Sequence, residues 1–353
     1  MIDIGAGTMD LLCYDSESGS HFKSVARSPV IEIAERINST PGDLLLTGCE
    51  MGGGNLSEVL KKRAKVNKVI MTRSASATLS HDIDKILSSD IKVIDDNDAP
   101  DFIENNSYSH LEISDVDLGR IKGIVDGLGF PFQFDVAAIC AQDHGVPPRG
   151  LSHLDFRHNV FRQNLEKFPY AYSLLYRDDE IPDAMNRLKS IAKDTKKIPA
   201  DEIYVMDSGM AAILGTSLDM EGSNTERKIV LDIATSHTVG AALEGDEICG
   251  FFEYHTRDIS LIKLEELIIE LAEGRLEHKK ILAEGGHGAY MRKRLGFESI
   301  EMILATGPKR RIILGSKLPI RLGAPFGDNM MTGTTGLLEA VRIRKNLVPF
   351  IYI

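Results

Sequence analysis

Short apolar runs that end in Gly, Ser or Thr recur along the chain, and several of them lead into helical patterns. Runs of this kind are "DLLLTGCEMGGG", "KVIMTRSASAT", "DVAAICAQDHG", "EIYVMDSG", "KIVLDIATS" and "MILATGP". A helix with one apolar face is predicted between residues 261 and 276, where the i, i+3, i+4 spacing is kept by Leu261, Leu264, Leu267, Ile268 and Leu271. Strands that alternate with helices indicate an α/β fold with largely parallel sheets.

Another helix is predicted in "NLSEVLKKRAK". Asn55 is a candidate N-cap and Glu58 follows three residues later, which is the spacing of a capping box. The preceding "TGCEMGGG" places a glycine-rich turn between a strand and this helix. Such a junction can bind an anion, although a tight turn without a ligand is the plainer interpretation.

Two segments that lie far apart share one plan. Both "MIDIGAGTMDLLCYD" and "KIVLDIATSHTVGAALEGDEI" contain an apolar strand with an acid, then small residues, a Thr and a second apolar run. Asp3 and Asp232 occupy equivalent places in the two copies. Polar segments at about 95–110 and 219–228 interrupt the chain, and the second of them leads into the second copy. The pattern therefore predicts a duplicated fold whose site lies in the cleft between its halves.

The first copy has the residues of a phosphate and metal site. The glycines at positions 5 and 7 would let a tight hairpin bring backbone N–H groups against phosphate oxygens, because no Cβ stands in the way. An Asp at the strand end can hold Mg²⁺, directly or through water, since this cation prefers oxygen ligands. The alternative is a first strand that ends in an ordinary glycine-rich turn.

Composition narrows the function classes. A chain of 353 residues is long enough for two domains. Its net charge of −11 argues against a duplex nucleic-acid binder, which carries a basic footprint, but a local nest of backbone N–H groups can still bind a small anion. No apolar run approaches the roughly 18–20 residues of a membrane span, and the start lacks the regions of a signal peptide. We therefore expect a cytoplasmic protein without a nucleic-acid or membrane partner.

Five segments resemble the motifs of the actin, hexokinase and DnaK-chaperone superfamily, in that superfamily's order. They are the first phosphate motif "DIGAGTMD", the segment "EIYVMDSGMAAILGTS" that leads into the connecting helix, the second phosphate motif "IVLDIATSHTVGAAL", the adenosine motif "MILATGPKRRIIL" and the closing helix in "GDNMMTGTTGLLEAV". The resemblance implies an α/β fold of two duplicated ribonuclease-H-like (actin-like ATPase) domains with an interdomain cleft. We expect these domains at residues 1–207 and 208–353, with a last helix at about 331–345 that packs back on the first domain.

The resemblance also implies ATP and Mg²⁺ as cofactors, and it assigns roles to residues at the matching positions. Asp3 and Asp232 would hold Mg²⁺. Asp3 and Asp207 would be the catalytic acids, with Asp207 orienting the attacking water or hydroxyl. The nucleotide would be contacted by Gly5, Gly7, Thr8, Asp10, Asp232, Ser236, Thr238, Thr306 and Gly307.

The chain departs from the superfamily pattern in two motifs. Ala234, Thr235 and Ser236 stand where the second phosphate motif usually has glycines. Their Cβ atoms crowd the approach of a phosphate, so binding there would be looser or would use the side-chain hydroxyls. Pro308 replaces a second glycine in the adenosine motif.

A closer match is to a family within this superfamily that is often labelled "putative pyruvate formate-lyase activating enzyme". The label implies radical chemistry with S-adenosylmethionine and a [4Fe–4S] cluster, which needs clustered thiolates. Cys13, Cys49, Cys140 and Cys249 are far apart in the sequence and form no such motif. We therefore do not expect a radical S-adenosylmethionine activase.

Two further turns are candidate substrate contacts. "QDHG" at 142–145 resembles a Gln-x-His-Gly turn with which sugar kinases of the superfamily touch their substrates, and this implies contacts from Gln142 and His144. His287 in "LAEGGHGAYMRKR" could act as an acid, a base or an anion ligand near pH 7. The structural alternatives are a capped loop with a satisfied histidine and an ordinary surface loop.

The sequence thus predicts an ATP-dependent phosphotransferase or ATPase, a kinase or hydrolase whose acceptor is an unidentified small molecule or protein. The main alternative is a nucleotide-dependent switch or assembly protein, because actin-like folds close around ATP and thereby change their partner contacts. A fold that no longer binds ATP is a third hypothesis. A homo-oligomer is compatible with each of them.

Overall fold

The computed structural model describes residues 1–104, 107–148, 150–219 and 225–352. Parts of both polar segments, residues 105–106 and 220–224, lie outside the described residues. The strands are β1 (Ile2–Ile4), β2 (Thr8–Tyr14), β3 (His21–Arg27), β4 (Leu44–Gly48), β5 (Val69–Thr72), β6 (Ile91–Ile94), β7 (Ser109–Ile113), β8 (Phe134–Ala141), β9 (Leu175–Arg177), β10 (Ala200–Met206), β11 (Arg227–Ile233), β12 (His237–Glu244), β13 (Glu247–His255), β14 (Gly288–Met291), β15 (Met302–Thr306) and β16 (Ile320–Leu322). The α-helices are α1 (Pro29–Ser39), α2 (Gly54–Ala64), α3 (Arg73–Ser76), α4 (Ile83–Leu87), α5 (Ala99–Glu104), α6 (Leu118–Gly127), α7 (His153–Leu165), α8 (Asn186–Thr195), α9 (Ser208–Ser217), α10 (Leu261–Ala272), α11 (His278–Ala283) and α12 (Thr332–Arg344).

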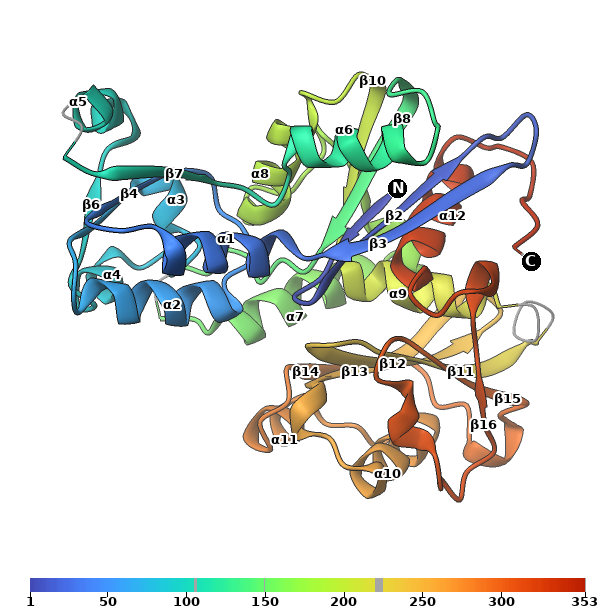
Figure 1. Ribbon diagram of the computed structural model, residues 1–353. Coiled ribbons are helices and arrows are strands. Elements are labelled where there is room, and N and C mark those ends of the chain that lie inside the picture. Colours follow the sequence, from blue (N-terminus) through green and yellow to red (C-terminus); the bar gives the residue numbers. More distant parts are fainter. Residues whose placement is uncertain (105–106, 149, 220–224, 353) are drawn as a thin grey trace.

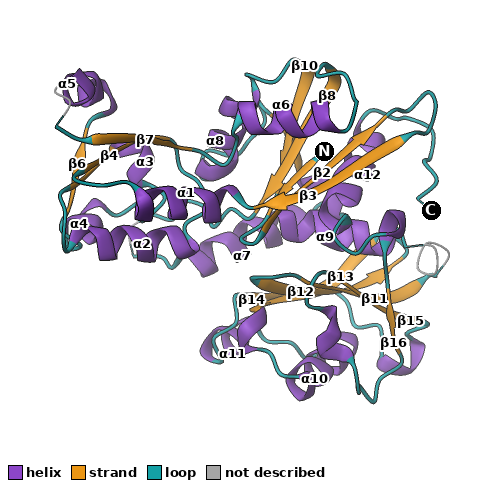
Figure 2. Ribbon diagram, viewed as in Figure 1, coloured by secondary structure: helices purple, strands orange, loops and turns teal. Residues whose placement is uncertain are grey.

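Two six-stranded sheets repeat one plan (Figures 1 and 2). The first has the order β3-β2-β1-β8-β10-β9 and the second has the order β14-β13-β12-β11-β15-β16. In each, three consecutive strands form an antiparallel meander, and the first of them then pairs in parallel with a later strand, β1 with β8 and β11 with β15. This repeated order confirms the predicted fold of two duplicated ribonuclease-H-like domains.

A third sheet was not predicted. It has the order β6-β5-β4-β7, is parallel throughout, and is inserted between β3 and β8 of the first domain. The expectation of largely parallel sheets holds for this sheet and is wrong for the two larger ones, which are mixed. The reason is their hairpins, since a short turn can join only antiparallel neighbours.

The two helices predicted from local patterns had different outcomes. The predicted helix at 261–276 is confirmed as α10, and its apolar face at Leu264, Leu267 and Leu271 is fully buried. The capping box at Asn55 is wrong, because α2 begins one residue earlier and its N-cap is Gly53, without a side-chain hydrogen bond. The helix takes in Gly54 because this glycine adopts a φ of +40°, which few other residues tolerate.

Helices α9 and α12 cross between the two large sheets (Figure 1). A Cβ on Gly215 would lie 1.9 Å from the carbonyl oxygen of Thr332, and a Cβ on Gly336 would lie 1.8 Å from that of Ala211. The two helix backbones can approach this closely only because both crossing residues lack a side chain.

Helix α12 also reaches the first hairpin. It contacts β1, β2 and β8, and a Cβ on Gly333 would lie 2.0 Å from Oδ2 of Asp3. The crossing therefore fixes the start of α12 against the first predicted phosphate motif. No helix among the described residues has the length and apolar character needed to cross a bilayer.

Candidate functional site

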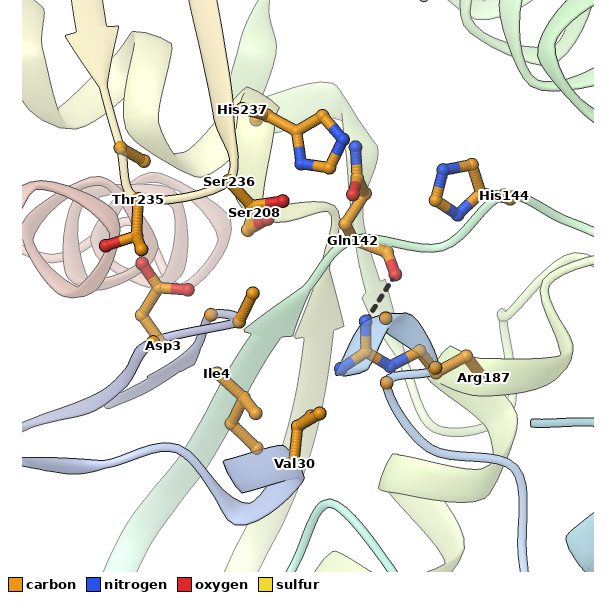
Figure 3. A pocket seen from close by; sticks show the side chains of 18 of the residues that line it. Asp3, Ile4, Val30, Gln142, His144, Arg187, Ser208, Thr235, Ser236 and His237 are labelled. Atoms are coloured by element: carbon orange, nitrogen blue, oxygen red, sulfur yellow. Dashed lines mark hydrogen bonds between the residues drawn. The ribbon is translucent and has the colours of Figure 1, made fainter. Parts of the chain in front are cut away.

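A cavity of about 670 Å³ lies between the two large sheets and the inserted domain. The hairpin turns at 5–7 and 234–236 line it, as do the "MGGG" turn at 51–54 and the "QDHG" turn. Figure 3 shows Asp3, Gln142 and His237 approaching this space from the two domains. The size is typical of a small-ligand site.

Asp3 and Asp10 form a carboxylate pair at the first hairpin. They are register partners on β1 and β2, and each has an Oδ1 atom that is buried without a hydrogen-bond partner among the described residues. Burial, with a smaller contribution from the Asp207 charge, raises the pKa of Asp3 to about 6. Burial and the neighbouring Asp3 charge raise the pKa of Asp10 to about 8. The pair therefore carries unbalanced negative charge when it ionises.

Asp232 brings a third carboxylate from the second hairpin. Burial and the charge of Asp3 raise its pKa to about 7. Gly307 packs against it, since a Cβ on this glycine would lie 2.5 Å from Oδ1 of Asp232. Three buried carboxylates that raise one another's pKa are a donor set suited to a hard divalent cation such as Mg²⁺.

The two hairpin turns face each other across the cleft. A Cβ on Gly7 would lie 3.0 Å from Cγ2 of Thr235. Gly5, Thr8 and Ser236 line the cavity beside this contact. The predicted phosphate motifs of the two domains are thus brought to one place.

The predicted site residues divide into two groups. Those that line the cavity are Asp3, Gly5, Gly7, Thr8, Asp10, Asp232, Ser236, Gln142, His144 and His287. Those that lie behind its wall are Asp207, Thr238, Thr306 and Gly307. In the second group, the hydroxyl of Thr238 bonds to that of Thr256 at 3.0 Å and the hydroxyl of Thr306 bonds to that of Thr332 at 2.9 Å.

Asp207 is engaged inside the protein. It is the N-cap of α9 and accepts hydrogen bonds from the Gly209 amide at 2.9 Å and from the Arg157 guanidinium at 2.9 and 3.0 Å. Burial raises the pKa of Asp207 more than the opposing charge of Arg157 lowers it. A catalytic role for Asp207 stays a prediction, and its contacts are those of a residue that acts through Arg157.

Arg157 and Glu253 were missed by the sequence reasoning. Arg157 joins Asp207 to Glu253 in a buried ion-pair network, and Glu253 also accepts a hydrogen bond from Nε2 of Gln142. Burial alone would raise the pKa of Glu253, but the charge of Arg157 outweighs it and holds that pKa well below its usual range. A glutamate inside the apolar run "EICGFFEYH" was the one local signal for this network.

Arg187 holds the "QDHG" turn. Its guanidinium donates to the carbonyl oxygen of Gln142 at 2.7 Å (Figure 3) and to Asp115 at 2.8 and 2.9 Å. Asp143 in the same turn accepts from the amides of Gly145 and Leu188. The turn is therefore rigidly held against the cavity.

Histidines gather on the opposite wall. His144 and His287 have ring centroids 5.8 Å apart, and His237 and His255 lie beside His287. Burial, followed by the charge of Arg157, lowers the pKa of His144 to about 3. Burial outweighs the opposing charge of Glu253 and lowers the pKa of His237 to about 4. The sequence reasoning found His144 and His287 but missed the other two.

A family model matches residues 51–312, which is more than half of the chain. Its description is "Putative pyruvate format-lyase activating enzyme (DUF1786)". The chain belongs to this family. Among the described residues, the four cysteines of this family member lie on β2, after β4, on β8 and on β13. No curated protein matches the chain.

Solved structures with a related arrangement include three quite different proteins. A "PilM-PilN type IV pilus biogenesis complex" matches at 11% identity and a TM-score of 0.36, over 99% of this chain and 98% of that one. "Lmo2764 protein, a putative N-acetylmannosamine kinase, from Listeria monocytogenes" matches at 12% identity and a TM-score of 0.35, over 98% of both chains. "MreB5 of Spiroplasma citri bound to ADP" matches at 10% identity and a TM-score of 0.33, over 98% of this chain and 96% of that one.

At these scores the matches carry no argument of their own, and the assignment rests on the strand order. The duplicated sheets and the facing phosphate motifs confirm that the chain has the fold of the actin, hexokinase and DnaK-chaperone superfamily.

Proposed function

We propose that the chain binds ATP with Mg²⁺ in the cleft and acts as a phosphotransferase or ATPase. The observation that carries this proposal is the convergence of Asp3, Asp10 and Asp232 between two facing hairpin turns in one cavity. A cation would neutralise the three carboxylates, and phosphates would fill the space between the turns.

Asp3 and Asp232 would hold Mg²⁺, directly or through water. Bound there, the cation would offset charge on the phosphate oxygens during phosphoryl transfer. The unpartnered Oδ1 atoms of Asp3 and Asp10 support this role, because a buried carboxylate oxygen without a partner is costly. The start of α12 against Asp3 would hold that carboxylate in one orientation.

The turns would contact the phosphates. The amide of Gly5 is used inside its own turn, where it bonds to the carbonyl oxygen of Thr8 at 3.0 Å. Gly5 would therefore contribute space, while Gly7, Thr8 and Ser236 would contribute donors. Thr306 and Gly307 would shape the nucleoside end from behind Pro308, which lines the cavity.

The acceptor side would be formed by Gln142, His144 and His287. Gln142 and His144 belong to the turn that Arg187 holds, and a fixed acceptor geometry is what phosphoryl transfer requires. We propose Asp207 as a positioning group in this scheme, which orients Arg157 and, through it, Glu253.

Calorimetric titration of the full chain with ATP, with and without Mg²⁺, tests the proposal. We expect Mg²⁺-dependent binding, and about 2.7 kcal/mol of added stability when ATP is present at about 100 times its Kd. Asp232→Asn should remove the Mg²⁺ dependence. Asp246→Asn, which changes an exposed acid between β12 and β13, is the matched control and should bind as the parent does.

Two outcomes would contradict the proposal: no binding at millimolar ATP, or Mg²⁺-dependent binding that Asp232→Asn leaves unchanged. Binding without turnover, accompanied by nucleotide-dependent light scattering, would instead support the switch or assembly hypothesis. That hypothesis is favoured by one observation, namely that a ligand in this cavity would contact both domains at once.

A further inference from the structure

Three histidines come together at one edge of the second sheet. His237 is the first residue of β12, His255 is the last residue of β13, and His287 directly precedes β14. His237 and His255 are register partners, and the His287 amide donates to the carbonyl oxygen of Glu253 at 2.8 Å. Strand pairing therefore presents the three rings side by side.

The distances between the rings suit a small metal ion. Nε2 of His287 lies 3.1 Å from Nε2 of His255, and the nearest ring nitrogens of all three residues lie within 4.8 Å of one another. Tetrahedral zinc with Zn–N bonds of about 2.0–2.1 Å sets its ligand nitrogens about 3.3 Å apart. The observed cluster thus needs only small side-chain rotations to reach that geometry.

Hydrogen bonding inside the protein leaves the cluster unsatisfied. Nε2 of His237 and Nδ1 of His287 are buried without a hydrogen-bond partner among the described residues. The His287 side chain is only 8% exposed, so water reaches it poorly. Native proteins rarely leave buried polar atoms in this state unless a ligand or an ordered water completes them.

Glu253 stands in the place of an outer-shell partner. Its Oε1 lies 3.7 Å from Nδ1 of His287, on the side of the ring away from His255. Arg157 and Gln142 hold Glu253 in turn. A carboxylate that orients the free nitrogen of a ligating histidine is a recurrent feature of zinc sites.

We propose that His237, His255 and His287 bind one divalent transition-metal ion, with Zn²⁺ as the favoured ion, and leave a coordination position open to the cavity. Imidazole nitrogens favour zinc and its neighbours in the transition series, whereas the three carboxylates of the hairpins favour Mg²⁺. All three histidines line the cavity, so the open position would take water or an anionic oxygen of a substrate.

The test uses the full chain, treated with a chelator, dialysed and then titrated with Zn²⁺ alone. We expect one ion per chain. Co²⁺ should bind in competition with Zn²⁺ and give the intense visible absorption of a tetrahedral nitrogen site. No nucleotide is present, so failure here leaves the ATP proposal untouched, and the converse also holds.

Variants separate the site from adventitious binding. His237→Ala, His255→Ala and His287→Ala should each lower Zn²⁺ affinity by about 100-fold or more, and Glu253→Gln by about 10–100-fold. The control is His110→Ala, which removes an exposed histidine from β7 in a different sheet and should leave the affinity unchanged. Thermal denaturation shows which variants are folded.

Several results would overturn the proposal: the absence of stoichiometric Zn²⁺ binding by the parent, an octahedral Co²⁺ spectrum, or an equal loss in His110→Ala. Folded His→Ala variants that keep the parent's affinity would do the same and would leave a hydrogen-bonded histidine cluster only. Should the variants fail to fold, the stoichiometry and the Co²⁺ spectrum of the parent decide the question.

Discussion

The hairpins of the two domains have the same backbone and different chemistry. The Gly5 amide bonds to the Thr8 carbonyl at 3.0 Å, and the Ala234 amide bonds to the His237 carbonyl at 3.1 Å. The turns have equal length, because Asp3 pairs with Asp10 and Asp232 pairs with Val239.

The residue after the third strand repeats the same contacts. Ser28 donates its hydroxyl to the Gly5 carbonyl at 2.6 Å, and Thr256 donates its hydroxyl to the Ala234 carbonyl at 2.8 Å. The Ser28 amide bonds to the carbonyl of Gly7, as the Thr256 amide does to that of Ser236. The two halves therefore correspond residue by residue around their turns.

What differs is the set of side chains on this common frame. Thr8 and Arg27 on the first frame correspond to His237 and His255 on the second, and Asp10 corresponds to Val239. One frame thus presents paired carboxylates and the other presents imidazoles. The difference teaches that the backbone positions the site, while each half has its own ligand chemistry.

The largest expected effect comes from separating the two halves. Gly336→Ala would place a methyl group 1.8 Å from the carbonyl oxygen of Ala211 and should cost about 3 kcal/mol or more. Gly123→Ala on α6 is the matched control, since a Cβ there meets nothing within 4 Å, and it should gain about 0.5–1 kcal/mol. Urea denaturation measures both. Equal stabilities would mean that the helix crossing is looser than described.

Asp10→Val makes the first hairpin resemble the second. We expect Mg²⁺-dependent ATP affinity to fall about 100-fold, which corresponds to about 2.7 kcal/mol, because the carboxylate pair is lost. Without Mg²⁺ the variant should be more stable than the parent, since an unpartnered buried carboxylate is gone. Calorimetry and thermal denaturation check the two parts. A loss of stability in both conditions would indicate misfolding, and unchanged affinity would exclude Asp10 from the site.

Gly7→Ala tests the contact between the two frames. Its new methyl would press on Thr235 at 3.0 Å, so we expect about a tenfold loss in ATP affinity, or about 1.4 kcal/mol. Gly5→Ala is the control, because its Cβ would lie 3.5 Å from the nearest atom, the Thr8 carbonyl oxygen. Thr235→Ser in the Gly7→Ala background should recover part of the loss. No recovery would show that the methyl acts within its own turn.

The smallest effect should come from pH. Burial, followed by the charge of His278, lowers the pKa of His158 to about 4, against about 6.5 when unfolded. Between these values the unfolded chain binds more protons, so the free energy of unfolding should fall as the pH drops from about 6.5 to 4. His158→Gln should flatten this slope in denaturant titrations at several pH values. An unchanged slope would assign the acid sensitivity to other groups.

The sequence predicted those features that have a local pattern. Asp3 and Asp232 each follow apolar residues and precede small ones, so the duplicated hairpins were visible. Asp207 was recognised at the start of a helix, which is where it caps α9, but its ion pair with Arg157 spans 50 positions and has no local pattern.

The histidine cluster could not be predicted for the same reason. His255 meets His237 through the register of β12 and β13, and His287 joins them through the pairing of β13 with β14. These pairings depend on how the whole sheet packs. The inserted sheet was missed because its apolar runs could equally have extended the first sheet.

The location of Asp3 in the fold has a kinetic consequence. Strand β1 pairs with β2 on one side, but its other edge stays open until β8 has been synthesised, and α12, which covers Asp3, follows much later. A chain emerging from the ribosome would therefore expose an unpaired strand edge for most of its translation, a period in which aggregation competes with folding. The cleft is the last part of the molecule to form.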